Sequence, residues 1–221
     1  GLERIAWGMG CFNESLRGTV SLACAKSYTV HDLLYAVAID KPEEMWNRER
    51  HGVGSKGETI DADDWLTWGV DKVTYKTPDY MLASAQDYRP GQKGYQQHIW
   101  QATMGPDAVV FVTHPSKVSE EGSHRPNYWH GNVVLPRVAQ WKDVLIAVHK
   151  LPPDDWLGFT HAYWPTHAFE WCELRDGWAF ARRGEGYLAL TAARGIELVQ
   201  HGDHAYRDLR SYGTENVWLC H

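Results

Sequence analysis

The chain has 221 residues, 43% of them hydrophobic, with a net charge of −6 and a pI near 6.0. This composition supports a sizeable core and excludes a disordered chain, while the acidic balance argues against a nucleic-acid partner, which would need a basic surface. No apolar run reaches the roughly 18 to 20 residues of a membrane span, so we expect a soluble protein without a membrane partner. A secreted or periplasmic location is compatible with this expectation.

Residues 1–60 differ in pattern from the rest of the chain. HDLLYAVAID, at residues 31–40, places apolar side chains on one helical face. KPEEMWNRER, at residues 41–50, begins with Pro42 and two glutamates, which suit a helix N-terminus. We therefore predict a short helical segment and a glycine-rich linker, followed by a β domain over residues 61–221. The chain opens without a methionine or a signal-peptide pattern, which favours a piece of a longer protein.

From about Val70 the hydrophobic period changes to two. Alternating segments bounded by Gly and Pro turns follow one another from VDKVTYKT to NVWLCH. Among them, YQQHIWQAT and AVVFVTH are joined by MGPD and are predicted to form a hairpin. The pattern predicts about ten to twelve short strands in a mainly β fold, a multi-stranded antiparallel β-sandwich preceded by the short helical segment.

The residue counts add two weaker indications. Twelve Trp and eleven Tyr favour a carbohydrate-handling protein, because flat amphipathic rings pack on sugar faces as well as at core edges. The four cysteines, at positions 11, 24, 172 and 220, show no C-x-x-C spacing and are expected to be free thiols.

Three histidines, His98, His114 and His130, follow one another at intervals of sixteen residues. If the hairpin turns about MGPD, His98 faces His114 with Cβ atoms about 4.5–5.5 Å apart. His130 opens the next strand, and a third ring completes a familiar zinc arrangement together with water. We therefore predict that these residues bind zinc or another divalent metal. His161 and the HGDH loop that ends at His204 are weaker candidates.

The stretch 94–140 resembles the C-terminal β-sandwich of the heparinase II/III-like polysaccharide lyases. In that family an H-x-H-x-D segment, an apolar run and a D-P-G turn precede a strand that opens with an H-N pair. In this chain the residues at the corresponding positions are QQH, which ends at His98, then H-P, which begins at His114, and H-G-N, which begins at His130. The resemblance implies that the same three histidines hold a zinc ion. Gln96 stands in place of the family's first histidine and His114 in place of its aspartate, which favours a structural metal over a reacting centre.

The resemblance also implies a supersandwich-like fold in which residues 1–60 are a remnant of an α/α-toroid. It implies an enzyme that cleaves uronic-acid-containing glycans by β-elimination, so the expected ligand is a polysaccharide or oligosaccharide. The expected protein partner is a preceding helical toroid domain or a second copy of the chain in a homodimer. In this reaction a base removes a proton, positive groups neutralise the uronate carboxylate and an acid, commonly Tyr, protonates the leaving oxygen. The candidate catalytic residues near the sugar are Tyr95, Arg125, Tyr128 and Arg137.

Two other functions stay open on the residues alone. A non-catalytic carbohydrate-binding module would display Trp and Tyr on a flat sheet face. A cupin-like metalloenzyme would gather the histidines at a barrel centre beside Gln96 and Gln101. The sequence contains no G-x-S-x-G elbow, P-loop or dinucleotide-binding motif.

Overall fold

The computed structural model describes residues 44–52, 69–86, 88–94, 97–118, 126–129 and 131–221, which form two antiparallel sheets. The eight-stranded sheet has the spatial order β1 (Met45–Gly52), β2 (Gly69–Lys76), β3 (Met81–Gln86), β4 (Trp100–Thr103), β5 (Val109–Thr113), β8 (Phe159–Tyr163), β13 (Asp208–Tyr212) and β12 (Glu197–Leu198). The six-stranded sheet has the order β6 (Arg137–Trp141), β7 (Val144–Lys150), β14 (Glu215–Cys220), β11 (Gly186–Ala192), β10 (Trp178–Arg183) and β9 (Trp171–Arg175). A 3₁₀ turn, Thr166–Ala168, links β8 to β9. In the described part of the chain, no helix is long and apolar enough to cross a membrane.

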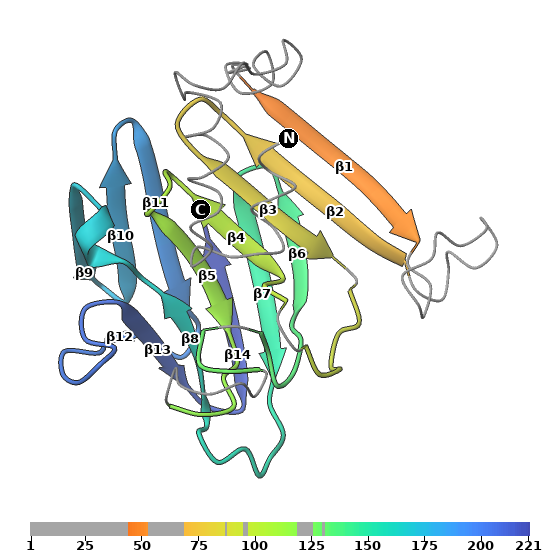
Figure 1. The fold of residues 1–221 in the computed structure, drawn as a ribbon, viewed down its shortest axis with the longest axis vertical. Coiled ribbons are helices and arrows are strands. Elements are labelled where there is room, and N and C mark those ends of the chain that lie inside the picture. Colours follow the sequence, from red (N-terminus) through yellow and green to blue (C-terminus); the bar gives the residue numbers. More distant parts are fainter. Residues whose placement is uncertain (1–43, 53–68, 87, 95–96, 119–125, 130) are drawn as a thin grey trace, which may run out of the picture.

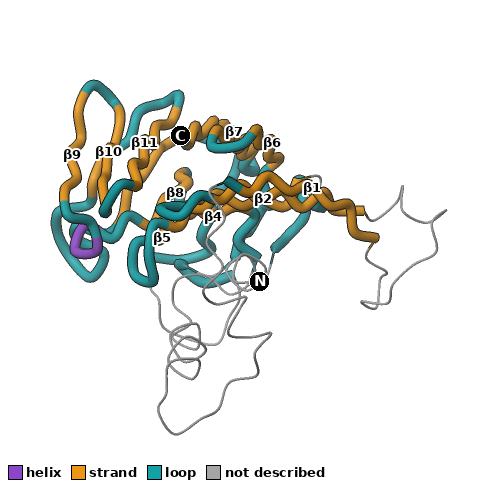
Figure 2. Tube along the Cα trace, turned by 90° about the horizontal axis from the view of Figure 1, so that it is seen from above, coloured by secondary structure: helices purple, strands orange, loops and turns teal. Residues whose placement is uncertain are grey.

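The two sheets pack face to face (Figure 1), and a view from above shows them as two layers (Figure 2). The core between them contains Trp100 and Val112 from the eight-stranded sheet and Leu190 and Trp218 from the six-stranded sheet. Burial of such large apolar side chains is the main favourable contribution to folding. The predicted mainly β fold with antiparallel sheets is therefore confirmed. The two described cysteines, at positions 172 and 220, are free thiols, as expected.

Burial along the strands differs between the sheets. β6 and β7 alternate exposed and buried residues along their length, as strands do when one face meets the core and the other meets water. β5 and β8 are instead buried at every position. Val112 and Ala162 join the core between the sheets, whereas Phe111 and Tyr163 project to the opposite side and form a second cluster there. We call this opposite side of the eight-stranded sheet the outer face.

We call residues 126–135, of which position 130 is not described, the cover segment: Tyr128 and Trp129 lie over the outer face, and the segment ends at Leu135, which packs in the core between the sheets. Its Tyr128 and Trp129 pack against aromatic side chains of β5 and β8. Asn132 and Gly94 exchange two backbone hydrogen bonds of 2.8 Å, which anchor the segment to the turn before β4. The cover segment explains why the two central strands are buried on both faces.

The predicted hairpin is present, with the expected register. Ala102 pairs with Val110 and Thr103 pairs with Val109 across a loop that contains MGPD. The two apolar segments and the MGPD turn between them predicted this pairing, given a turn centred on Pro106.

The prediction of a helical N-terminal segment is wrong for the part that the structure describes. Residues 45–52 form β1, which pairs with β2 from Met45–Lys76 to Gly52–Gly69. Helix propensity is a weak preference, and a full-length ladder with an adjacent strand outweighs it. The remainder of residues 1–60, including the HDLLYAVAID segment, lies outside the described residues.

The strand after position 130 also differs from its predicted place. It begins at Arg137, directly after Pro136, and pairs with β7 in the six-stranded sheet. It is therefore not a neighbour of β4 or β5, as the three-histidine site required. Pro136 lacks a backbone donor, so it suits the point where the chain leaves one layer and enters the other.

Candidate functional site

Aromatic side chains fill the space between the outer face and the cover segment. Phe111, Phe159 and Tyr163 come from the sheet, and Tyr128 and Trp129 come from the cover segment. All five are at most 7% exposed. We call this group the outer aromatic layer, and a buried polar cluster lies beside it.

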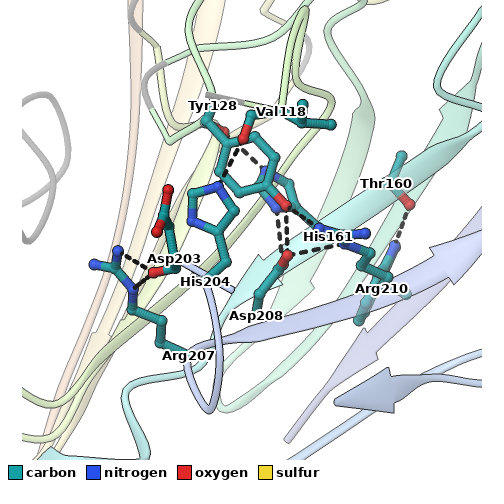
Figure 3. A network of polar contacts seen from close by, with 10 residues as sticks. Val118, Tyr128, Thr160, His161, Asp203, His204, Arg207, Asp208 and Arg210 are labelled. Carbon is teal, nitrogen blue, oxygen red and sulfur yellow. Dashed lines mark hydrogen bonds and ion pairs between the residues drawn. The ribbon is translucent and has the colours of Figure 1, made fainter. Parts of the chain in front are cut away.

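Asp208, the first residue of β13, is the centre of this cluster (Figure 3). Its Oδ1 contacts Nδ1 of His161 at 2.9 Å. Its Oδ2 accepts hydrogen bonds from the Tyr128 hydroxyl and, at 2.9 Å, from Nε of Arg210. Nη2 of Arg210 in turn donates to the Tyr128 oxygen at 2.9 Å. We call these four residues the Asp208 network.

Both nitrogens of the His161 ring have partners in the structure. Its Nε2 lies 2.8 Å from the backbone oxygen of Tyr128, which can only accept, so this nitrogen carries a hydrogen. Its Nδ1 faces a carboxylate oxygen, which also accepts while Asp208 is ionised. The His161 ring therefore connects Asp208 to the backbone of the cover segment through its two nitrogens.

The pKa shifts agree with an ionised Asp208. Burial alone would raise the pKa of Asp208, but contacts with His161, Tyr128 and Arg210 outweigh it and lower the pKa below its ordinary value. Burial and the neighbouring Asp208 raise the pKa of Tyr128, so this hydroxyl keeps its proton. Burial opposes the charge of Arg210, yet Tyr212, Tyr128 and Asp208 raise its pKa.

Stacked rings hold the network in position. The imidazole of His204 lies parallel to the Tyr128 ring with centroids 3.9 Å apart, and its Nε2 donates to the Val118 oxygen at 2.7 Å. The indole of Trp129 stacks on His161 with centroids 4.6 Å apart. Side chains that are fixed by both packing and hydrogen bonds lose little further freedom when a ligand binds.

One member of the network reaches the surface. The Arg210 side chain is 20% exposed, whereas the side chain of Asp208 is fully buried. The guanidinium lies over the ring of Phe159, 4.8 Å from its centroid. Tyr212, two residues further along β13 and therefore on the same face, is 47% exposed. The outer face thus presents a fixed cation beside an exposed aromatic ring.

The two described members of the predicted metal site, His98 and His114, have different partners in the structure. The His98 ring stacks on Phe111 with centroids 3.9 Å apart, and its Nε2 contacts the Trp129 oxygen at 2.7 Å. Nε2 of His114 instead contacts Oδ1 of Asp155 at 2.9 Å, and burial lowers the pKa of His114 although Asp155 opposes the shift. Across the described ranges, no group of three His, Cys, Asp or Glu side chains is placed to hold a metal ion. His130 lies outside the described residues, so the zinc site stays a prediction and no chemical step is derived from it.

The four candidate catalytic residues have different positions. Tyr128 is fully buried within the Asp208 network. Arg137 is exposed at the start of β6 in the other sheet and does not belong to the network. Tyr95 and Arg125 lie outside the described residues and stay predictions. Of this set, only Tyr128 is therefore placed by the structure in the candidate site.

Sequence reasoning missed Asp208 and Arg210 and ranked His161 as a weak candidate. A signal for the first two was present, because the alternation in RDLRSYG places Asp208, Arg210 and Tyr212 on one side of a strand. Their partner Tyr128 lies 80 residues earlier in the chain. A contact over that separation depends on the sheet topology, which alternation alone does not give.

Comparisons with family models, with curated proteins and with solved structures found no match for this chain. The resemblance to the heparinase II/III-like lyases accordingly stays a prediction.

Proposed function

We propose that this chain is the glycan-binding β part of a polysaccharide lyase that acts by β-elimination on uronic-acid-containing glycans, and that Arg210 binds a uronate carboxylate. The observation that carries this proposal is the guanidinium of Arg210, held at the surface by Asp208 and Tyr128. Arg is suited to planar carboxylates, and a guanidinium that is already fixed binds with a smaller loss of entropy.

Within the network, the guanidinium of Arg210 is the group that suits an acidic ligand. Asp208 contacts His161 through Oδ1 and Arg210 through Oδ2. Glu197 of β12 pairs with Arg210 across the ladder, so carboxylate recognition here rests on the fixed planar fork of the guanidinium and not on a net positive charge. A charge in a partly buried site is screened less by salt than charges elsewhere on the surface. The Arg210 guanidinium therefore acts on a bound ligand more strongly than the remote acidic groups do.

The aromatic surroundings suit a sugar ring. Tyr212 offers an exposed ring beside Arg210, and its centroid lies 5.7 Å from that of Phe159. Trp156, 70% exposed, lies in the loop that leads into β8, next to Leu157, which packs on the outer aromatic layer. Exposed rings of this kind stack on the apolar faces of sugars.

Tyr128 has a positioning role in this proposal. Its hydroxyl is buried and donates to Asp208, so it does not reach a polymer at the surface. The base and the acid of the elimination are assigned to groups outside the described residues, as the resemblance implies for a helical toroid domain. The same observation favours the second candidate function, a carbohydrate-binding module that performs no chemistry.

Binding to sugar oligomers of known charge tests the proposal. We expect oligogalacturonate to bind the wild type in isothermal titration calorimetry, and a neutral gluco-oligomer of equal length to bind much more weakly. Arg210→Lys keeps the charge but loses the planar fork, and we expect it to weaken oligogalacturonate binding about tenfold. Arg137→Met, on the opposite sheet, should leave the affinity unchanged.

Two results of these binding experiments would contradict the proposed site. A loss of affinity in Arg137→Met with full affinity in Arg210→Lys would assign the glycan to the six-stranded sheet and contradict the proposed site. Equal binding of the acidic and neutral oligomers would contradict carboxylate recognition. Incubation with uronic polysaccharides, followed in the ultraviolet for unsaturated products, separates the two candidate functions, since binding without product is the result expected of a module.

A further inference from the structure

The solvent side of the six-stranded sheet displays aromatic rings on β9, β10 and β11. Ala179 and Ala181 of β10 belong to the core between the sheets, so the residues that alternate with them point away from the core. Trp171 of β9 and Tyr187 of β11 both pair with Arg182 of β10, one on each side. Directly paired residues project from the same face of a sheet. Both rings are accessible there, since Trp171 is 45% exposed and Tyr187 is 62% exposed.

Two further rings lie on the same side of β10. Trp178 and Phe180 are half-buried, and their rings are stacked with centroids 6.1 Å apart. Trp171 and Tyr187 are two strands apart, so their backbones are separated by about 9.5 Å. This separation is similar to the length of two sugar units in an extended chain. We call these four residues the aromatic face.

The arginines beside these rings are paired with carboxylates. Nη2 of Arg182 lies 3.4 Å from Oε2 of Glu170, and Nη1 of Arg175 lies 3.1 Å from Oε1 of Glu173. The guanidinium of Arg175 also lies over the ring of Phe180, 5.6 Å from its centroid. Each of these two cations therefore has an anion next to it, so the aromatic face offers flat apolar surface with compensated charge.

We propose that the aromatic face binds the surface of a neutral polysaccharide with extended β-1,4-linked chains, and that its rings stack on the apolar faces of the sugars. Compensated charge favours an uncharged ligand, and flat exposed rings favour a ligand that is apolar on one side. The rings come from three paired strands, which fix their positions and reduce the loss of entropy on binding.

An insoluble polymer suits this arrangement better than a short soluble oligomer does. Its surface presents neighbouring parallel chains, so several rings make contact at the same time and their contributions combine. The inference does not rest on the proposed function, because Arg210 belongs to the other sheet and takes a charged sugar.

Depletion of the full chain from solution by microcrystalline cellulose tests the proposal. Granular starch is the matched control, because it consists of the same sugar in coiled α-linked chains. We expect the wild type to bind cellulose in preference to starch and to stay bound at high salt. Trp171→Ala and Tyr187→Ala should each weaken binding about tenfold. Ile146→Ser removes a 44% exposed apolar side chain from β7 of the same sheet, outside the aromatic face, and should keep the wild-type affinity.

Other results would overturn the proposal. Absence of cellulose binding, or full affinity in a Trp171→Ala/Tyr187→Ala double variant, would remove the site. Equal binding to starch would show that the extended chain is not recognised, and an equal loss in Ile146→Ser would show unspecific adsorption to apolar surface. A wild-type dimer in analytical ultracentrifugation that Tyr187→Ala converts to a monomer would assign the face to a second copy of the chain.

Two further measurements complete the test. Circular dichroism and thermal unfolding should show both alanine variants folded, because the two rings that they remove are exposed. Arg210→Lys should leave cellulose binding unchanged, so failure of the aromatic face is distinguishable from failure of the uronate site.

Discussion

His161 and Asp208 face each other from neighbouring strands, with Nδ1 and Oδ1 2.9 Å apart and both side chains fully buried. They come from β8 and β13, where Arg210 pairs with His161 and Asp208 pairs with Tyr163. The pair is therefore diagonal across the ladder, and the other carboxylate oxygen stays available for Tyr128 and Arg210. A single carboxylate thus connects two strands to the cover segment.

Replacement of Asp208 by Asn should strongly destabilise the protein. The change keeps the shape but removes the buried negative charge that pairs with Arg210 and faces Nδ1 of His161. Loss of one partner of a buried ion pair costs about 3–5 kcal/mol in the free energy of unfolding. Urea denaturation measures this, with Asp154→Asn, an exposed carboxylate, as control. A difference from wild type as small as that of the control would show that the network contributes little.

Tyr128→Phe should separate the positioning role of the hydroxyl from the packing of the ring. The ring still stacks on His204, but the bridge from Arg210 to Asp208 is lost. We expect about 1–2 kcal/mol lower stability, together with weaker oligogalacturonate binding and no change in the secondary structure seen by circular dichroism. Unchanged affinity at reduced stability would restrict Tyr128 to a structural role.

His149 should make the stability sensitive to mild acid. Its side chain is buried, neither ring nitrogen has a hydrogen-bond partner within the described part of the chain, and burial, with His114 and His161 nearby, lowers its pKa to about 3. Above pH 6.5, the ordinary pKa of His, the ring is neutral in both states. Between this value and about 3 the unfolded chain takes up a proton that the folded chain does not. Stability then falls by up to about 1.4 kcal/mol per pH unit as the pH decreases.

A His149→Leu variant tests this origin of the acid sensitivity. Leu has no titrating group and removes two buried nitrogens without partners in the described residues. The dependence of the free energy of unfolding on pH should therefore become flatter between pH 6.5 and 4. His201→Gln, an exposed histidine, is the control and should follow the wild type. An equal slope in His149→Leu and wild type would assign the acid sensitivity to other groups.

Gly94→Ala should destabilise the anchor of the cover segment. A Cβ at this position would lie 2.9 Å from Cγ of Leu135 and nearer still to its Cδ2. Because Leu135 is buried, it has little room to move, and we expect a loss of about 1–3 kcal/mol. In the double variant Gly94→Ala/Leu135→Ala the clash is absent, so thermal unfolding should show less than the sum of the two single effects. Additive effects would contradict the close contact.

Metal content tests the three-histidine prediction directly. If His98, His114 and His130 hold a metal, purified protein should contain about one zinc per chain, and His114→Ala should lose it. Elemental analysis of both proteins after exhaustive dialysis gives the answer. Stoichiometric zinc retained in His114→Ala would contradict the site as predicted, and His167→Ala, an exposed histidine, controls for adventitious binding.

Much of the strand pattern was predictable because it depends on local signals. The β4–β5 register followed from two apolar segments on either side of a turn centred on Gly-Pro, and it placed Ala102 opposite Val110. β1 was missed because Pro42 and two glutamates suggest a helix start, whereas its ladder with β2 is a tertiary contact. The candidate site was least predictable. Asp208 and Tyr128 meet only because β13 lies beside β8 and the chain after β5 folds back over both.

The cover segment lies over the outer face without joining either ladder, apart from the isolated bridge between Gly94 and Asn132. Its departure would break its backbone hydrogen bonds to the loops beside β4 and β5, such as Val133 N–H to the His114 oxygen and Leu135 N–H to the Gln92 oxygen, but would leave β5 and β8 paired. Such a sub-global opening has a lower free energy than complete unfolding, and the two kinds of opening are distinguishable by native-state hydrogen exchange. The amides of β8 should exchange only with global unfolding, while the indole proton of Trp129 should exchange earlier. Access of water to the buried His161–Asp208 pair would then be controlled by a loop and not by the stability of the sheets.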